Sequence, residues 1–275
     1  MNKQNEVKTM KILLTGARGF VGSRIADAMD VVAAPSLRAM TDEDVRRLVG
    51  ETGPDVIIHT AAISDIGDCA RDPEGSFRAN VEIPLALVRT GVKTVLFSTD
   101  QVYSGRADEG PYAEDVTAPA NLYAEHKLEM ERRALDENPD TVLLRAAWMY
   151  DMPKYGVRNR RNFLVNMLRE SELAFSSTQY RGISYVREVA AHMREAVRLP
   201  GGVYNYGSEN SLTMLETAQW LADELRLKIR LRDAGPRHNL RMDGAKLRAH
   251  GIAFRDTVGG LRQCIEDYAL NMNKL

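Results

Sequence analysis

The chain has 275 residues, of which 44% are hydrophobic and 27% are charged, and its formal net charge at pH 7 is −1. This is the composition of an ordinary globular protein that can bury a core without the help of disulfides or metals. The balanced charge argues against a nucleic-acid-binding platform.

Neither a zinc site nor a membrane-spanning segment is indicated. The two cysteines, Cys69 and Cys264, are far apart, and the five histidines show no paired spacing. No apolar run reaches the ~18 residues that a membrane helix requires. Residues 1–9 lack the apolar centre of a signal peptide and are expected to be a frayed extension. We therefore expect a cytoplasmic protein without a metal.

In the first 150 residues, short apolar runs alternate with longer amphipathic segments. Strands are expected at residues 11–15, 31–34, 55–60, 94–98 and 141–146, and helices at 19–29, 42–50, 73–90 and 121–138. Short apolar strands separated by helices predict a parallel sheet that is covered on both faces. Because crossovers between parallel strands are right-handed, the prediction is an α/β fold with a Rossmann-type doubly wound parallel sheet.

From residue 151 onward the pattern indicates a smaller C-terminal α/β substrate lobe. Residues 151–161 are polar and basic and are expected to form a loop. Helices are expected at 162–170, 187–199, 213–225 and 257–271, and strands at 182–185, 203–206 and 228–231. We assign residues 1–150 to an NAD(P)-binding Rossmann domain and residues 151–275 mainly to a substrate-binding lobe, with a discontinuous boundary.

A glycine-rich turn follows the first expected strand. Gly16, Gly19 and Gly22 are spaced by three residues in the segment TGARGFVG, which opens the first expected helix. Such glycines permit a tight turn, a close approach of the backbone to a pyrophosphate, and close packing of helix on strand. The helix N-terminus favours an anion. Dinucleotide binding is therefore predicted, and a glycine-rich turn without a ligand is the alternative.

Three residues in chain order, Thr99, Tyr123 and Lys127, predict hydride-transfer chemistry. Tyr123 and Lys127 lie four residues apart in an expected helix, so that their side chains share a face. An ammonium group beside a phenol lowers the phenol's pKa from its usual ~10. Tyr123 is then the expected general acid, and Thr99 binds the substrate carbonyl oxygen. The alternative is an ordinary helix in which the tyrosine packs and the lysine is solvated.

The chain resembles the extended short-chain dehydrogenases/reductases, and among them most closely the dTDP-4-dehydrorhamnose reductase family. The segments that carry the resemblance are TGARGFVG (15–22), PDVIIHTAA (54–62), PE leading to Asn80 (73–80), FSTDQVY (97–103), PYAED (111–115), YAEHK (123–127) and LRAAWMY (144–150). Less distinctive similarity continues at 185–190, 202–204 and 239–247.

The resemblance implies a reductase of a keto sugar that is linked to a nucleotide, with the second lobe gripping the nucleotide. It assigns catalysis to Thr99, Tyr123 and Lys127. It places the cofactor contacts at Gly16, Arg18, Gly19, Phe20, Val21, Ala61, Ala62, Tyr123 and Lys127. A homodimer is compatible with it.

The sequence departs from this family in three places near the expected substrate. Residues 63–68 lack the usual aromatic and acidic pattern, Gln101 stands where a tyrosine is common, and Ile183 and Ser184 replace a Pro-Thr pair. None of these departures touches the three catalytic candidates. The keto-sugar chemistry is therefore expected, while the identity of the sugar is left open.

The cofactor is expected to be NADP, with NAD as the alternative. An acid after the second strand would bind the ribose 2′-hydroxyl of NAD, whereas an arginine accommodates the 2′-phosphate of NADP. No acid occurs between the second expected strand and Asp42, and Arg18 and Arg38 are candidate phosphate partners. A solvated Arg38 without a ligand is the alternative.

Two other functions remain open. A sugar-nucleotide epimerase or dehydratase would share the fold and the Tyr-Lys pair, and Asp100 beside Thr99 keeps dehydration under consideration. A non-catalytic nucleotide-binding regulatory subunit, like that of methionine adenosyltransferase, would bind the cofactor without turnover.

Overall fold

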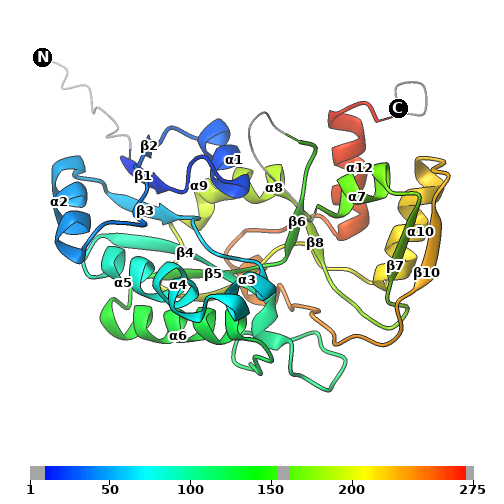
Figure 1. Ribbon diagram of the computed structural model, residues 1–275. Coiled ribbons are helices and arrows are strands. Elements are labelled where there is room, and N and C mark those ends of the chain that lie inside the picture. The colour runs from blue at the N-terminus through cyan, green and yellow to red at the C-terminus, as the bar shows by residue number, and fades with distance from the viewer. Residues whose placement is uncertain (1–9, 154–161, 271–275) are drawn as a thin grey trace, which may run out of the picture.

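A computed structural model describes residues 10–153 and 162–270 of the chain. The expected N-terminal extension and most of the expected loop at 151–161 lie outside these ranges. Figure 1 shows a central sheet with its helices on the left and a smaller lobe with α7 (Phe163–Arg169), α10 (Met214–Glu224) and α12 (Thr257–Asp267) on the right.

The central sheet has six parallel strands in the order β2-β1-β3-β4-β5-β9. The chain begins at β1, places β2 on one side of it, and then crosses back to add β3, β4, β5 and β9 on the other side, which is the predicted doubly wound Rossmann-type fold. Its strands are β1 (Ile12–Thr15), β2 (Val32–Ala33), β3 (Val56–His59), β4 (Lys93–Thr99), β5 (Val142–Ala146) and β9 (Gly202–Tyr206).

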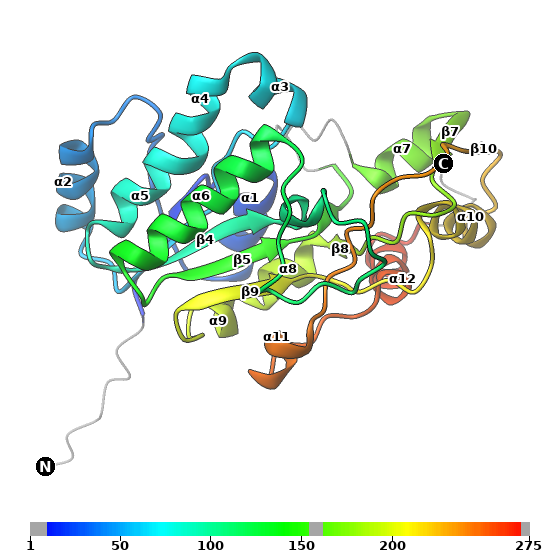
Figure 2. The ribbon, with the colours of Figure 1, turned by 90° about the horizontal axis from the view of Figure 1, so that it is seen from below.

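Alternate side chains of the strands enter different cores on the two faces of the sheet. Leu13 and Ile57 pack against α2 and α5 on one face, whereas Leu14 and Ile58 pack toward α1 on the other. Figure 2 shows α4, α5 and α6 on one side of β4 and β5, and α9 on the opposite side. The helices of this part are α1 (Phe20–Ala28), α2 (Asp42–Thr52), α3 (Ile66–Arg71), α4 (Pro73–Phe77), α5 (Ile83–Val88), α6 (Leu122–Glu137), α8 (Val186–Ala191) and α9 (Met193–Ala196), with a π-helical turn at Arg78–Glu82 and a 3₁₀ turn at Asp100–Tyr103.

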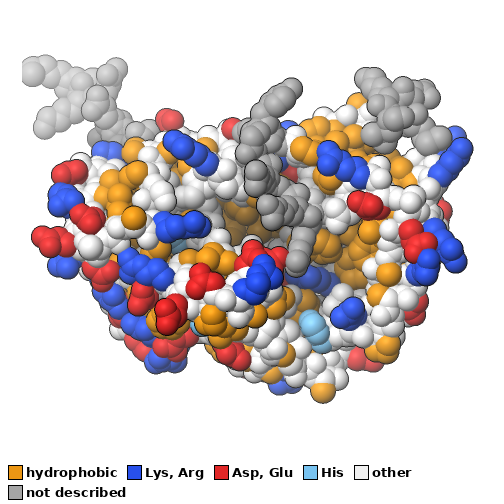
Figure 3. All heavy atoms as spheres, in the orientation of Figure 1, with side chains coloured by type: hydrophobic (Ala, Val, Ile, Leu, Met, Phe, Trp, Pro, Cys, Tyr) orange, Lys and Arg blue, Asp and Glu red, His pale blue; other side chains and the backbone are white. Residues whose placement is uncertain are grey.

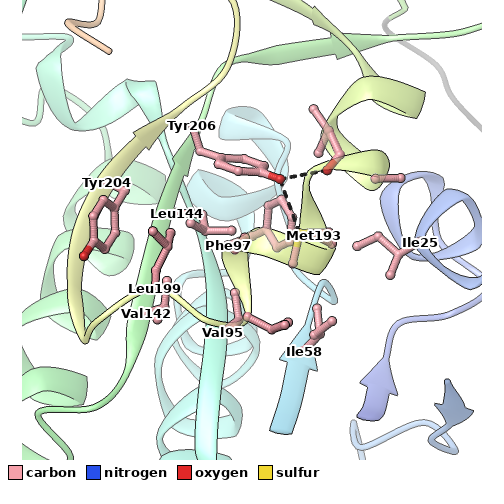
Figure 4. Packing of buried hydrophobic residues seen from close by; sticks show 14 of the residues in the cluster. Ile25, Ile58, Val95, Phe97, Val142, Leu144, Met193, Leu199, Tyr204 and Tyr206 are labelled. Carbon is pink, nitrogen blue, oxygen red and sulfur yellow. Dashed lines mark hydrogen bonds between the residues drawn. The ribbon is translucent and has the colours of Figure 1, made fainter. Parts of the chain in front are cut away.

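Residues beyond 150 complete the core of this sheet. Figure 4 shows Tyr206 of β9 beside Met193 of α9 and Phe97 of β4, with Ile25 of α1 on the far side. The Tyr206 hydroxyl donates to the Val189 carbonyl oxygen at 2.8 Å. The polar end of this buried tyrosine is thereby satisfied, and β9 with its neighbouring helices forms part of the half that contains the central sheet.

The second lobe contains two small parallel sheets. One pairs β6 (Trp148–Tyr150) with β8 (Ile183–Tyr185), and the other pairs β7 (Glu172–Phe175) with β10 (Arg230–Asp233). Apolar side chains of α7, α10 and α12 form its own core. A short helix, α11 (Ala245–Ala249), packs beside β9.

Several elements differ from the sequence-based expectation. The helix expected at 187–199 is divided at His192 into α8 and α9, and the strand expected at 228–231 begins two residues later, at Arg230. α3 was not expected because it is short and mostly polar. Its start is fixed by Asp65, whose side chain accepts a hydrogen bond from the Asp68 amide, and its inner face by the buried Cys69.

Candidate active site

The glycine turn connects the end of β1 to the start of α1. Gly19 is the N-cap residue of α1, and its amide donates to the Gly16 carbonyl oxygen at 2.8 Å. Because Gly19 carries no side chain that could cap the helix, the first amides of α1 are available to an anion.

Close backbone packing makes glycine necessary at two positions of this turn. Gly16 has a φ of +75°, and a Cβ atom there would lie 2.6 Å from Thr60 Oγ1 and 2.8 Å from the Ala61 amide nitrogen. A Cβ atom on Gly22 would lie 2.2 Å from the Gly16 carbonyl oxygen. The turn therefore lies directly against the segment after β3, and this open cradle fits the pyrophosphate of a dinucleotide.

The other expected cofactor contacts surround this cradle. Phe20 and Val21 form the first turn of α1, and Ala62 is exposed just after β3. Arg18 in the turn and Arg38 between β2 and α2 are both exposed. Neither guanidinium group is therefore enclosed by the fold.

Thr99, Tyr123 and Lys127 come together beside the carboxyl end of β4. Thr99 is the last residue of β4, and α6 begins at Leu122 after Asn121, whose side chain accepts a hydrogen bond from the Ala124 amide. The Thr99 hydroxyl lowers the pKa of the Tyr123 phenol and the Asp100 carboxylate raises it, so these side chains lie close together. Lys127 follows one turn later, and its side chain is only 2% exposed. All three side chains are buried.

Burial dominates the electrostatics of these groups. It raises the pKa of Tyr123 above its ordinary value, and the Asp100 carboxylate nearby adds to that rise. It lowers the pKa of Lys127 to about 8, although Glu131 acts in the opposite direction. The expectation that the pKa of Tyr123 is lowered was therefore wrong for the protein without ligands, because the loss of water around the phenolate outweighs the groups that lower this pKa, of which Thr99 and Arg181 are the strongest.

His59 at the end of β3 is a buried neighbour of this group that the sequence did not single out. Its Nδ1 is hydrogen-bonded to Thr15 Oγ1 at 2.6 Å. Burial and the charge of Lys127 lower the pKa of His59 to about 3, so its ring is neutral. The histidine thus links β1, β3 and the Lys127 region at one edge of the sheet.

Asp100 and Arg181 form a second arrangement that the sequence did not reveal. Asp100 directly follows Thr99, and Arg181 comes from the second lobe, 81 residues further along the chain. The guanidinium donates to both carboxylate oxygens, at 2.8 Å and 3.1 Å. No sequence signal links these positions, because the contact depends on how the lobe folds back over β4.

The residues that depart from the expected family pattern are structural neighbours of this region. The Gln101 side chain accepts a hydrogen bond from Asn121 Nδ2 at 3.3 Å, at the N-terminus of α6. Ile183 and Ser184 lie buried in β8, and Ser184 Oγ accepts from the Ser208 amide at 2.8 Å. Gln101 thus contacts the N-cap residue of α6, whereas Ile183 and Ser184 belong to the interior of the second lobe.

The face drawn in Figure 3 has mixed acidic and basic side chains over its left part, and apolar side chains gather between this part and the right-hand part. Within 10–153 and 162–270, no helix is long and apolar enough to cross a bilayer. The same residues include no cluster of three or more His, Cys, Asp or Glu side chains that could hold a metal ion.

Comparison with known protein families identifies the chain's relatives. Residues 10–241 match the model of the RmlD substrate binding domain. The chain belongs to this family. A relative in the family, the dTDP-4-dehydrorhamnose reductase of Burkholderia thailandensis, is 31% identical over 224 residues, which cover 72% of this chain and 73% of the relative.

Two further comparisons agree with this assignment. A probable dTDP-4,6-dihydroxy-2-methyloxan-3-one 4-ketoreductase of Streptomyces antibioticus is 29% identical, with 82% of this chain and 79% of the relative covered. The crystal structure of a Bacillus anthracis dTDP-4-dehydrorhamnose reductase in complex with NADP superposes with a TM-score of 0.83 at 21% identity, covering 94% of this chain and 99% of that one. At that identity the superposition confirms the Rossmann-type fold.

Proposed function

We propose that this protein is an NADPH-dependent reductase of a keto sugar that is linked to a nucleotide. The observation that carries the proposal is that the buried hydroxyl groups of Thr99 and Tyr123 lie close together, with the buried Lys127 one helical turn after Tyr123, at the sheet edge that carries the glycine turn. One carbonyl oxygen can contact both hydroxyls at once. The curated relatives, which are named as reductases of dTDP-linked sugars, support the substrate class.

The cradle at Gly16 and Gly19 would hold the pyrophosphate of the cofactor, and Arg18 and Arg38 would bind the 2′-phosphate of NADP. When bound, the nicotinamide ring supplies the hydride that reduces the carbonyl carbon. NADP is supported by the lack of an acid between β2 and Asp42 and by the NADP-bound neighbour in the fold comparison. NAD remains the alternative that a binding measurement distinguishes.

Tyr123 would act as the general acid. Its raised pKa keeps the phenol protonated at neutral pH, so it can donate that proton to the carbonyl oxygen as negative charge develops there. Thr99 would hold the same oxygen. Lys127, with a pKa near 8, would carry a positive charge below that pH, stabilise the phenolate that remains after proton transfer, and bind the ribose hydroxyls.

The geometry favours reduction over dehydration. A dehydratase would need a carboxylic acid beside Thr99 that is free to transfer a proton, but Asp100 already accepts hydrogen bonds from Arg181 and from the Thr99 hydroxyl. A cytoplasmic location is part of the proposal, supported by Cys69 and Cys264, which are both buried free thiols.

The test combines NADPH and NADH binding by fluorescence with NADPH oxidation in the presence of dTDP-4-dehydrorhamnose and other nucleotide-linked keto sugars. We expect NADPH to bind more tightly than NADH and to be oxidised. In Tyr123→Phe we expect oxidation to fall by about 100-fold or more while NADPH binding persists. Tight NADPH binding without its oxidation in the presence of any of these sugars would instead favour the regulatory subunit. Light scattering decides separately whether the protein is a homodimer.

A further inference from the structure

The ion pair between Asp100 and Arg181 connects the two parts of the molecule beside Thr99. Asp100 begins the turn after β4 of the central sheet, whereas Arg181 precedes β8 of the second lobe. The Asp100 side chain is 1% exposed and the Arg181 side chain 19% exposed. Two parallel N–H···O bonds to one carboxylate fix its plane as well as its position, which a single-point contact does not do.

Asp100 passes this orientation on to Thr99. The Thr99 hydroxyl donates to Asp100 Oδ1 at 3.3 Å, the same oxygen that accepts from Arg181 Nη2. Thr99 Oγ1 also accepts from the Gln101 amide at 3.2 Å. The Thr99 hydroxyl has a single proton, so it donates to Asp100 until a carbonyl oxygen takes the place of that acceptor. Until then the bond to Asp100 holds the hydroxyl in place near Tyr123.

Arg181 is itself held by the second lobe. Its guanidinium lies over the Trp148 ring, 5.4 Å from the ring centroid. Its carbonyl oxygen accepts from Asn210 Nδ2 at 3.0 Å, and its backbone forms a β-bridge with Leu240. The backbone of Arg181 is therefore anchored in the second lobe, and its guanidinium rests on Trp148 while it contacts Asp100.

We propose that Arg181 is a positioning residue of the reductase: it fixes the Asp100 carboxylate, and through it the Thr99 hydroxyl, in register with Tyr123. This inference rests on the proposed function and adds a role for the second lobe at the reacting carbonyl. Arg181 acts through Asp100 and Thr99, without touching the carbonyl oxygen itself.

The charge of Asp100 gives the proposal a pH signature. Burial raises the pKa of Asp100, and Arg181 is the strongest influence that lowers it again. The other titratable groups that face this carboxylate are Tyr123 of α6 and His238 of the second lobe. Without Arg181, Asp100 takes up a proton at a higher pH, and a protonated carboxyl group no longer directs the Thr99 hydroxyl.

The test compares Arg181→Gln and Arg181→Lys with wild type, using NADPH and dTDP-4-dehydrorhamnose. In Arg181→Gln we expect kcat to fall about 10- to 100-fold, with KM and the NADPH dissociation constant within about twofold of wild type. We expect the wild type to lose activity at acidic pH, where Asp100 becomes protonated, and we expect this acidic limb of the pH–activity profile to move up by about 1–3 pH units in Arg181→Gln. Arg181→Lys restores the charge but not the pair of hydrogen bonds to the carboxylate. It should therefore recover part of kcat and return the acidic limb of the pH–activity profile most of the way to its wild-type position.

Two controls separate positioning from folding. Arg262 stacks on Trp220 at the same 5.4 Å, on the outer side of the second lobe, and Arg262→Gln should leave kcat and the pH profile unchanged. Asp100→Asn should lower kcat as Arg181→Gln does, and the double variant should lose little more, because both act through one contact. If Arg181→Gln does not fold, Arg181→Lys and Asp100→Asn carry the same comparison.

Wild-type kcat and an unmoved acidic limb in Arg181→Gln would overturn the proposal, as would a loss of melting temperature without a change in the pH profile. A readout without substrate is the carboxyl ¹³C shift of Asp100 against pH, assigned with Asp100→Asn. We expect its midpoint to rise by about 1–3 pH units in Arg181→Gln, and an unchanged midpoint overturns the proposal. If the wild type is inactive on every keto sugar, the proposed function is refuted. The Asp100 titration then decides separately whether Arg181 keeps the Asp100 carboxylate ionised.

Discussion

Replacement of Lys127 by methionine should make the protein more stable and less active. Lys127 is 2% exposed, and burial lowers its pKa from an ordinary 10.5 to about 8. At about 1.4 kcal/mol per pH unit, the folded protein holds this ammonium at a cost of about 3 kcal/mol. Methionine has a similar length and no charge. Because the pKa of about 8 already includes the attraction of Glu131, this cost is a net value, and we expect the free energy of unfolding at pH 7 to rise by about 1–3 kcal/mol.

The pH dependence of this gain follows from the lowered pKa. Below pH 8 the lysine is charged in both the folded and the unfolded chain, so the full cost is present. Between pH 8 and 10.5 the folded protein releases the proton while the unfolded chain keeps it, so the wild type becomes more stable as the pH rises. The advantage of Lys127→Met is therefore largest below pH 8 and fades above it.

The assay is thermal unfolding of both proteins from pH 6.5 to 10, paired with NADPH oxidation. We expect the melting temperature of Lys127→Met to be about 2–8 °C higher at pH 7, and its turnover to be about 100-fold lower. Lys228→Met removes an exposed lysine of the second lobe and should change neither quantity. A variant that is less stable than wild type at pH 7, or a gain that persists unchanged to pH 10, would refute this reasoning.

Two further predictions concern the cofactor half. In urea titrations, Gly22→Ala should lower the free energy of unfolding by about 2 kcal/mol or more, because its Cβ would lie 2.2 Å from a backbone oxygen. The control is Gly50→Ala on α2, where nothing lies within 4 Å. It should raise the free energy of unfolding by about 0.5–1 kcal/mol. Equal effects of the two substitutions would contradict the close packing of the turn. Arg38→Glu should reduce the preference for NADPH over NADH, measured as the ratio of their dissociation constants, by about 10-fold or more. Arg46→Glu, on the exposed face of α2, should leave this ratio unchanged. An unchanged ratio in Arg38→Glu would exclude Arg38 as a phosphate ligand.

The local sequence pattern determined the fold of the nucleotide-binding half. Short apolar strands and the glycine spacing are local signals, and parallel strands can be connected only by crossovers of one hand. The turn at Gly16 and the shared face of Tyr123 and Lys127 were accordingly predictable, because a helix places residues four apart side by side.

Only the tertiary structure decided the contacts between distant segments and the burial of charge. The packing of the second lobe over the sheet decides three features: which half β9 joins, where the helix divides at His192, and the pairing of Asp100 with Arg181. The sequence-based expectation for the pKa of Tyr123 was wrong for the same reason. Spacing along a helix identifies a charged neighbour, but the loss of water around a phenol is a property of the whole fold.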